Sequence, residues 1–157
     1  MKYTILAVVV ALCWNFAMAQ SNGVVYTIES NHLEINAHIG ESRFWGSVVF
    51  ESPSYVLHAD SLVVSAVQNA AGRQELQRLH AWDNVELYYG DKRGFSDTLY
   101  YYHDRQTIVL EGNARLIDSR SSLAAPRITI HEPTGEAFVE GDESERVKVI
   151  FEDDRAD

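Results

Sequence analysis

The sequence predicts an all-β protein in which antiparallel strands repeat and form a rolled sheet. Apolar and polar residues alternate with a period of two, as at Leu99 and Tyr101 or at Ile108 and Leu110, which gives each strand one apolar and one polar face. β-branched and aromatic residues dominate these runs, and Gly, Asn and Asp separate them. A repeat of about 29 residues also extends through most of the chain.

Two series of landmarks define this repeat. The turn sequences WGSVVF, WDNVEL, EGNARL and EGDESE have their second residues at positions 46, 83, 112 and 141, at intervals of 37, 29 and 29. The apolar residues Leu33, Leu62, Leu99 and Ile128 follow at intervals of 29, 37 and 29. Both series lengthen by 8 residues at the same place, so one insertion near QNAAGRQE explains both. Gly72 and the lack of helical periodicity favour a loop there.

The first segment, residues 1–19, is typical of a secretory signal peptide. Lys2 precedes an apolar stretch that ends in Ala17-Met18-Ala19, the arrangement that signal peptidase recognises, so we expect cleavage before Gln20. The alternative, an uncleaved anchor, is less favoured because the apolar stretch is short and no basic cluster follows it. The single cysteine of the chain lies in this segment. A disulfide-free exported chain suits a periplasmic domain that buries its own core.

Residues 20–152 are expected to form one β domain, and residues 153–157 an acidic tail. Short strands are expected in YTIESNHLEI, ADSLVV, SDTLYY and APRITI. The pairs Asp83-Asn84 and Gly112-Asn113 predict tight reversals, because positive φ is tolerated by Gly, Asn and Asp. The apolar face of the sheet can be covered in a sandwich, a closed barrel or a roll, and the short repeat favours a roll with two open edges.

The composition excludes several classes of function. The chain has 13 basic and 23 acidic residues, a net charge of −10, which argues against binding nucleic acid or an anionic membrane surface. The six histidines are not spaced as zinc ligands, and there is neither a G-x-S-x-G nor a Gly-rich phosphate loop. We therefore expect no enzyme, metal or cofactor. The many aromatic residues either fill a core or line a lumen for acyl chains, and the residues alone leave both readings open.

The C-terminal half carries a resemblance to a known family. The turn in TIVLEGNARL, the return strand ending in RITI and the final GDESERVKV resemble the OstA-like family of periplasmic lipopolysaccharide-transport proteins, the LptA type. YTIESNHLEI and HADSLVV in the N-terminal half agree, so the resemblance covers about Tyr26 to Phe151. It implies a twisted, slightly open β-jellyroll in the periplasm that shields the acyl chains of lipid A. It also implies head-to-tail assembly with further copies and with LptC-like and LptD-like proteins.

The resemblance implies a lipid-binding lumen and no catalytic residues. It assigns lumen positions to Tyr26, Ile28 and His103, whereas Leu87, Leu99 and Tyr101 are also placed on an apolar face by the alternation. The complete predicted lumen comprises Tyr26, Ile28, Val48, Phe50, Leu62, Val85, Leu87, Leu99, Tyr101, His103, Ile108, Leu110, Leu116, Ile128 and Ile130. Two alternatives remain: an LptC-like subunit of the same pathway, and a structural periplasmic β-repeat that binds no lipid.

Overall fold

The computed structural model of the protein describes residues 23–152, and the predicted signal peptide and acidic tail lie outside this range. Every regular element in it is a β-strand. The strands are β1 (Thr27–Glu29), β2 (His32–Asn36), β3 (Glu41–Glu51), β4 (Tyr55–Gln68), β5 (Gln74–Tyr89), β6 (Lys92–Tyr102), β7 (Thr107–Ile117), β8 (Ser121–His131), β9 (Glu136–Glu140) and β10 (Lys148–Phe151).

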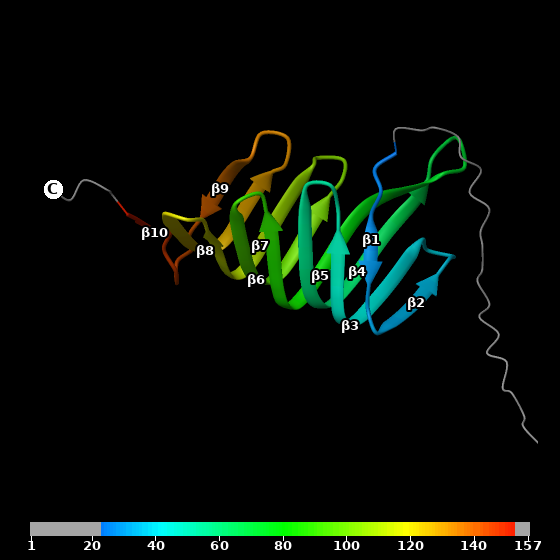
Figure 1. The fold of residues 1–157 in the computed structure, drawn as a ribbon, viewed down its shortest axis with the longest axis horizontal. Helices are drawn as coiled ribbons and strands as arrows, with labels where there is room; N and C mark the ends of the chain where they lie inside the picture. The colour runs from blue at the N-terminus through cyan, green and yellow to red at the C-terminus, as the bar shows by residue number, and fades with distance from the viewer. Residues whose placement is uncertain (1–22, 153–157) are drawn as a thin grey trace, which may run out of the picture.

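All ten strands belong to one antiparallel sheet whose order follows the chain. The strands β3 to β8 are neighbours in sequence and in space. Both β1 and β2 pair with β3, and both β9 and β10 pair with β8. Figure 1 shows the strands lined up along the long axis, with β1 and β2 at one end and β9 and β10 at the other. The predicted all-β class and open roll are confirmed.

The long strands are bent in the middle by β-bulges. The pairing register shifts after Trp45 in β3, after Trp82 in β5 and after Glu111 in β7. Positive φ angles of 62° and 52° at Asp83 and Asn84, and of 75° and 47° at Gly112 and Asn113, produce the bends in β5 and β7. The prediction of tight reversals at these pairs was therefore wrong. The chain kinks there and continues in the same strand, because both arms remain hydrogen-bonded to the same neighbours.

The bends are joined into a spine by side chains from neighbouring strands. Asn84 Nδ2 donates to Asp60 Oδ2 over 2.6 Å, and Asn113 Nδ2 donates to Asp97 Oδ2 over 2.8 Å. At the N-terminal end, the backbone N–H of Asn31 donates to the carbonyl of Gly46 over 2.9 Å. The first landmark series lies on the bends of β3, β5 and β7. In the second series, Leu62 and Leu99 lie two residues after Asp60 and Asp97, the spine residues of β4 and β6. One repeat is therefore a pair of bent strands.

The same pattern accounts for the short terminal strands. β1 and β2, separated by Ser30 and Asn31, occupy the place of one bent strand, and β9 and β10 occupy the place of another. The insertion lengthens β4 to 14 residues and β5 to 16. The predicted loop is confirmed only at its tip, residues 69–73, where Gly72 has a φ of 74°. Most of the inserted segment extends the hairpin.

The bends divide the sheet into two half-sheets that face each other. The first half-sheet consists of residues 32–36, 41–45, 61–68, 74–82, 98–102, 107–111, 127–131 and 136–140. The second consists of residues 27–29, 48–51, 55–59, 85–89, 92–96, 114–117, 121–125 and 148–151. They meet at the spine, and their opposite margins carry the hairpin turns.

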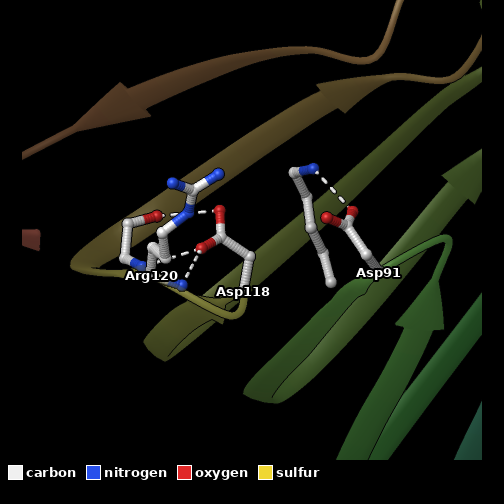
Figure 2. A network of polar contacts seen from close by, with 5 residues as sticks. Asp91, Asp118 and Arg120 are labelled. Atoms are coloured by element: carbon white, nitrogen blue, oxygen red, sulfur yellow. Dashed lines mark hydrogen bonds and ion pairs between the residues drawn. The ribbon is translucent and has the colours of Figure 1, made fainter. Parts of the chain in front are cut away.

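The turn between β7 and β8 shows how these margins are held by local hydrogen bonds. Asp118 accepts hydrogen bonds from the backbone N–H groups of Arg120 and Ser121, over 2.9 and 2.7 Å (Figure 2). These bonds stabilise the charged carboxylate and hold the pKa of Asp118 below its usual value. In the neighbouring turn Lys92 forms an ion pair with Asp91 over 3.0 Å. Because these contacts stay within or beside single turns, they do not join one half-sheet to the other.

Candidate functional site

The inward faces of the two half-sheets enclose a single apolar interior. Nine large side chains in it are less than 2% exposed: Phe50, Leu57, Leu62, Leu79, Leu87, Leu99, Ile108, Leu110 and Ile128. The half-sheets touch in the middle of the roll, since a Cβ added to Gly94 in the second would lie 3.1 Å from Leu110 Cδ1 in the first. Interior side chains therefore fill this part of the roll.

Two rows of register-matched inward residues run the whole length of the roll, one on each half-sheet. The row of the first half-sheet is Leu33, Phe44, Leu62, Ala81, Leu99, Leu110, Ile128 and Val139. The row of the second is Ile28, Phe50, Leu57, Leu87, Gly94, Leu116, Leu123 and Val149. Neither row contains a polar side chain. We call them the inner rows.

Most of the predicted lumen residues lie in this interior. Eleven are buried in one cluster: Val48, Phe50, Leu62, Val85, Leu87, Leu99, Tyr101, Ile108, Leu110, Ile128 and Ile130. Tyr26, Ile28 and Leu116 are partly buried and pack against this cluster. His103 is exposed in the turn after β6, with Nδ1 3.4 Å from the Tyr101 hydroxyl, which places it at the margin of the interior.

Sequence reasoning missed seven buried members of the cluster: Tyr55, Leu57, Ala59, Leu79, Ala81, Ala114 and Ala125. The period-two alternation that identified Leu87 also runs through Tyr55, Leu57 and Ala59, so this signal was present. The alanines lie beside the bends, where the half-sheets converge and only a small side chain fits. Their small size hides them from a search for large apolar residues.

Four tyrosines lie along the open margin, and we call Tyr26, Tyr55, Tyr89 and Tyr101 the tyrosine seam. The Tyr55 and Tyr101 rings meet across the margin with centroids 5.9 Å apart. The Tyr89 hydroxyl donates to the backbone carbonyl of Glu132 over 2.9 Å, again from one half-sheet to the other. In the described part of the chain no strand pairing crosses this margin. Side-chain contacts thus hold the open side of the roll.

Burial shapes the chemistry of the seam. It is the main cause that raises the pKa values of Tyr55, Tyr101 and Tyr26 above their ordinary range. The Glu132 carboxylate raises all three further, because its negative charge disfavours a phenolate nearby. The hydroxyls of Tyr26, Tyr55 and Tyr101 therefore remain neutral hydrogen-bonding groups at physiological pH.

Apolar side chains become exposed where the roll ends. At the N-terminal end Leu33 and Ile35 of β2 are 51% and 67% exposed. At the C-terminal end Ile150 and Phe151 of β10 are 53% and 73% exposed, and Phe138 of β9 is 72% exposed. Leu33 is the first member of an inner row, so the interior opens directly onto these end surfaces.

The outer face of the first half-sheet carries a chain of ring contacts. His80 stacks on Tyr100 with centroids 4.5 Å apart and also contacts Trp82 at 4.9 Å. Arg43 lies over the Trp82 ring at 5.6 Å. Burial, and secondarily the charge of Arg78, lowers the pKa of His80. Tyr100 thus lies on the face opposite to Leu99 and Tyr101, as the alternation predicts.

Residues 23–152 offer neither a metal site nor a membrane-spanning helix. No three His, Cys, Asp or Glu side chains gather closely enough there to hold a metal ion. That range also contains no helix of the length and apolarity needed to cross a bilayer. The apolar interior, which opens at the seam and at both ends of the roll, is the candidate site for an apolar ligand.

These features define an open β-jellyroll whose distinctive surface is an apolar interior. The sequence of residues 27–136 matches the family described as LptA/(LptD N-terminal domain) LPS transport protein, and the chain belongs to this family. The fold is similar to the crystal structure of LptH from Pseudomonas aeruginosa, the LptA-homologous periplasmic component of the lipopolysaccharide transport device. That likeness has a TM-score of 0.71 at 12% identity and covers 82% of this chain and 96% of LptH. Among curated proteins, none matches this sequence.

Proposed function

We propose that this protein carries lipopolysaccharide through the periplasm by shielding the acyl chains of lipid A between its half-sheets. The observation that supports this role is the pair of inner rows, which are apolar from β2 to β9 and from β1 to β10. An acyl chain exposed to water costs about 0.8 kcal/mol per CH₂ group. A carrier therefore needs an apolar track without polar interruptions, and the inner rows have that property.

Acyl chains require space, and the open margin is the direction from which it can be made. The filled interior has to widen before a chain enters, because even a Cβ added to Gly94 would lie only 3.1 Å from Leu110 Cδ1. Within each half-sheet, backbone hydrogen bonds join the strands, whereas the seam is closed by side-chain contacts such as Tyr55 with Tyr101. Separating the half-sheets at the seam breaks no strand pairing. The acyl chains would enter there while the sugars remain in water.

The sheet topology supports head-to-tail assembly. Directions alternate from strand to strand, so β9 and β10 run opposite to the direction that β1 and β2 of another copy would take beside them. Adding that copy would continue the antiparallel order through backbone hydrogen bonds. It would also cover Leu33 and Phe151, which are exposed at opposite ends. LptC-like and LptD-like rolls could occupy the same two ends.

Photo-crosslinking tests the lipid site. A benzoylphenylalanine placed at Tyr101 lies on the interior, and one at Tyr100 lies on the outer face of the same strand. We expect a lipopolysaccharide adduct from position 101 in live cells, detected by immunoblot, and much less from position 100. Equal adducts at both positions, or none in folded protein, would favour the structural β-repeat, for which the filled interior at Gly94 is the supporting observation.

Truncation tests the assembly. Removing the chain from Arg146 onward deletes β10, whose side chains are exposed along its whole length. We expect light scattering to show concentration-dependent oligomers of the complete protein and a folded monomer of the truncated one. A complete protein that stays monomeric at high concentration, and binds no related roll, contradicts the assembly.

Periplasmic location is the third part of the proposal. Cleavage between Ala19 and Gln20 would release the β domain into that compartment. Mass spectrometry of protein recovered from the periplasm should find Gln20 as the first residue. An intact Met1 would instead support the LptC-like alternative with a retained anchor.

A further inference from the structure

One buried hydroxyl group of the tyrosine seam has no hydrogen-bond partner. Tyr55 is 4% exposed, and its hydroxyl oxygen is the single buried side-chain polar atom in residues 23–152 that lacks a partner. A buried hydroxyl without a partner is unfavourable, because folding removes its hydrogen bonds to water and supplies none in return. The fold keeps this group where phenylalanine would fill nearly the same volume.

The other seam hydroxyls near Tyr55 are differently placed. Tyr89, its cross-strand neighbour, donates to the Glu132 carbonyl. The Tyr101 hydroxyl lies 3.4 Å from His103 Nδ1. The Tyr55 ring is fixed between Phe50 and Tyr101, with centroid distances of 5.8 and 5.9 Å. Tyr55 therefore presents a hydroxyl that no protein group occupies, and separation of the half-sheets at the seam would expose it to a ligand while Phe50 still packs on its ring.

The position of this hydroxyl suits the polar end of an acyl chain. Tyr55 lies at the open margin, where the apolar interior meets the outside of the roll. An amphiphile with its chains inside and its head outside has its polar linkage at this boundary. Tyrosine suits such boundaries because its ring is apolar and its hydroxyl is polar.

The local charge selects among polar groups. Burial is the main cause of the raised pKa values of Tyr26, Tyr55 and Tyr101, and the negative charge of Glu132 adds to it at all three, so a carboxylate already acts on this part of the seam. A phosphate or carboxylate would be repelled there. A neutral hydroxyl is favoured, because it both donates and accepts hydrogen bonds and so complements the tyrosine hydroxyl.

We propose that Tyr55 is a polar subsite within the apolar interior, which binds a neutral hydroxyl group carried near the head of an acyl chain. This proposal rests on the proposed acyl-binding function and adds a preference to it. The roll would favour hydroxylated chains over plain chains of equal length, and the preference would reside in one atom.

A matched pair of neutral ligands tests the subsite. Methyl 3-hydroxydodecanoate and methyl dodecanoate differ by one hydroxyl group, and each is titrated against the purified protein loaded with the fluorophore N-phenyl-1-naphthylamine. The measured quantity is the ratio of the two displacement constants. We expect Tyr55→Phe to reduce the preference for the hydroxylated ester by about five- to tenfold, the effect of one buried hydrogen bond.

Thermal unfolding of the same variants separates the subsite from a structural role. Tyr55→Phe should leave Tm unchanged or raise it, because no internal hydrogen bond is lost. Tyr89→Phe should lower Tm, because it removes the bond to Glu132. The control Tyr88→Phe removes a hydroxyl that donates to Glu86 away from the interior, and it should retain the ligand preference. A lower Tm for Tyr55→Phe would show that water or the protein already satisfies the hydroxyl, and the subsite would be wrong.

The ligand measurement also distinguishes this proposal from the function on which it rests. If both esters displace the fluorophore but Tyr55→Phe leaves their ratio unchanged, the acyl-binding interior stands and the subsite is overturned. If neither ester displaces the fluorophore from the folded parent protein, the acyl-binding interior itself is contradicted, and the subsite with it.

Discussion

The middle of the roll and its two ends are built from the same repeat but differ in burial. Leu33, Leu62, Leu99 and Ile128 occupy equivalent repeat positions in one inner row. Leu62, Leu99 and Ile128 are 0% exposed, whereas Leu33 is 51% exposed. In the middle, a bent strand on each side covers the residue. At the end, one of these strands is missing, so the same residue contributes to folding in one place and is available for association in the other.

The largest effect expected from this comparison comes from a charge placed in the middle. Leu99→Asp buries a carboxylate among apolar side chains and should reduce the free energy of unfolding by more than about 4 kcal/mol. Leu33→Asp, at the equivalent repeat position, should change it by less than about 0.5 kcal/mol and should abolish oligomers. Urea unfolding and light scattering measure the two effects. Equal destabilisation by both substitutions would remove the distinction between middle and end.

A glycine at a bend can be compared with a glycine at an end turn. Gly112 and Gly135 have similar φ angles of 75° and 68°. A Cβ added to Gly112 would lie 2.5 Å from Asp97 Oδ2, whereas a Cβ added to Gly135 would have no atom within 4 Å. Gly135→Ala should cost about 1 kcal/mol, the effect of the backbone alone, and Gly112→Ala clearly more. Thermal unfolding of both variants tests whether the spine is the more constrained region.

Acid should weaken the middle through His80. Its folded pKa is lowered from 6.5 by burial and by Arg78, so the unfolded chain binds the proton more readily. The stability that neutral His80 contributes is complete above pH 6.5 and is lost as the pH falls from 6.5 through the lower folded pKa. Urea unfolding between pH 7.5 and 5.5 should therefore show a larger decrease for the parent than for His80→Phe. Parallel curves would contradict this role.

The smallest effect is expected at the connection between β9 and β10. Asp142 accepts hydrogen bonds from the Ser144 hydroxyl and from the N–H groups of Ser144 and Glu145, each over 2.7 Å. Asp142→Ala should loosen this connection and speed hydrogen exchange in residues 148–151 without a measurable change in global Tm. A lower Tm would show that the C-terminal end contributes to the stability of the whole roll.

The fold was predictable because its repeat is visible in the sequence. The landmarks at Gly112 and Leu99 recur every 29 residues except across one insertion, and the alternation between Tyr100 and Tyr101 identified the outer and inner faces correctly. The sequence did not show that Asp83-Asn84 bends a strand instead of ending it. Both outcomes require positive φ, and the partner that decides between them, Asp60, is 24 residues away. The residue types at Asp83 and Asn84 do not reveal a hydrogen bond to a neighbouring strand.

The candidate site was predictable in its large residues and not in its margins. Leu87 and Ile108 are large, apolar and in phase, so their burial follows from the alternation. The alanines at the bends, such as Ala81 and Ala114, are buried by the convergence of the half-sheets, which no single strand reveals. The tyrosine seam depends on Tyr55 and Tyr101 meeting across the open margin, a contact between residues 46 positions apart.

The sequential order of the sheet has a kinetic consequence. Every strand from β3 to β8 pairs with the strand that precedes it and the strand that follows it, so the loops that must close are short for an all-β protein. The sheet can form by sequential addition of strands, in which each bent hairpin is the template for the next one. Folding can begin at the N-terminal strands before the C-terminal strands have been synthesised or exported. A chain with one more repeat would lengthen the roll without rearranging the part already formed.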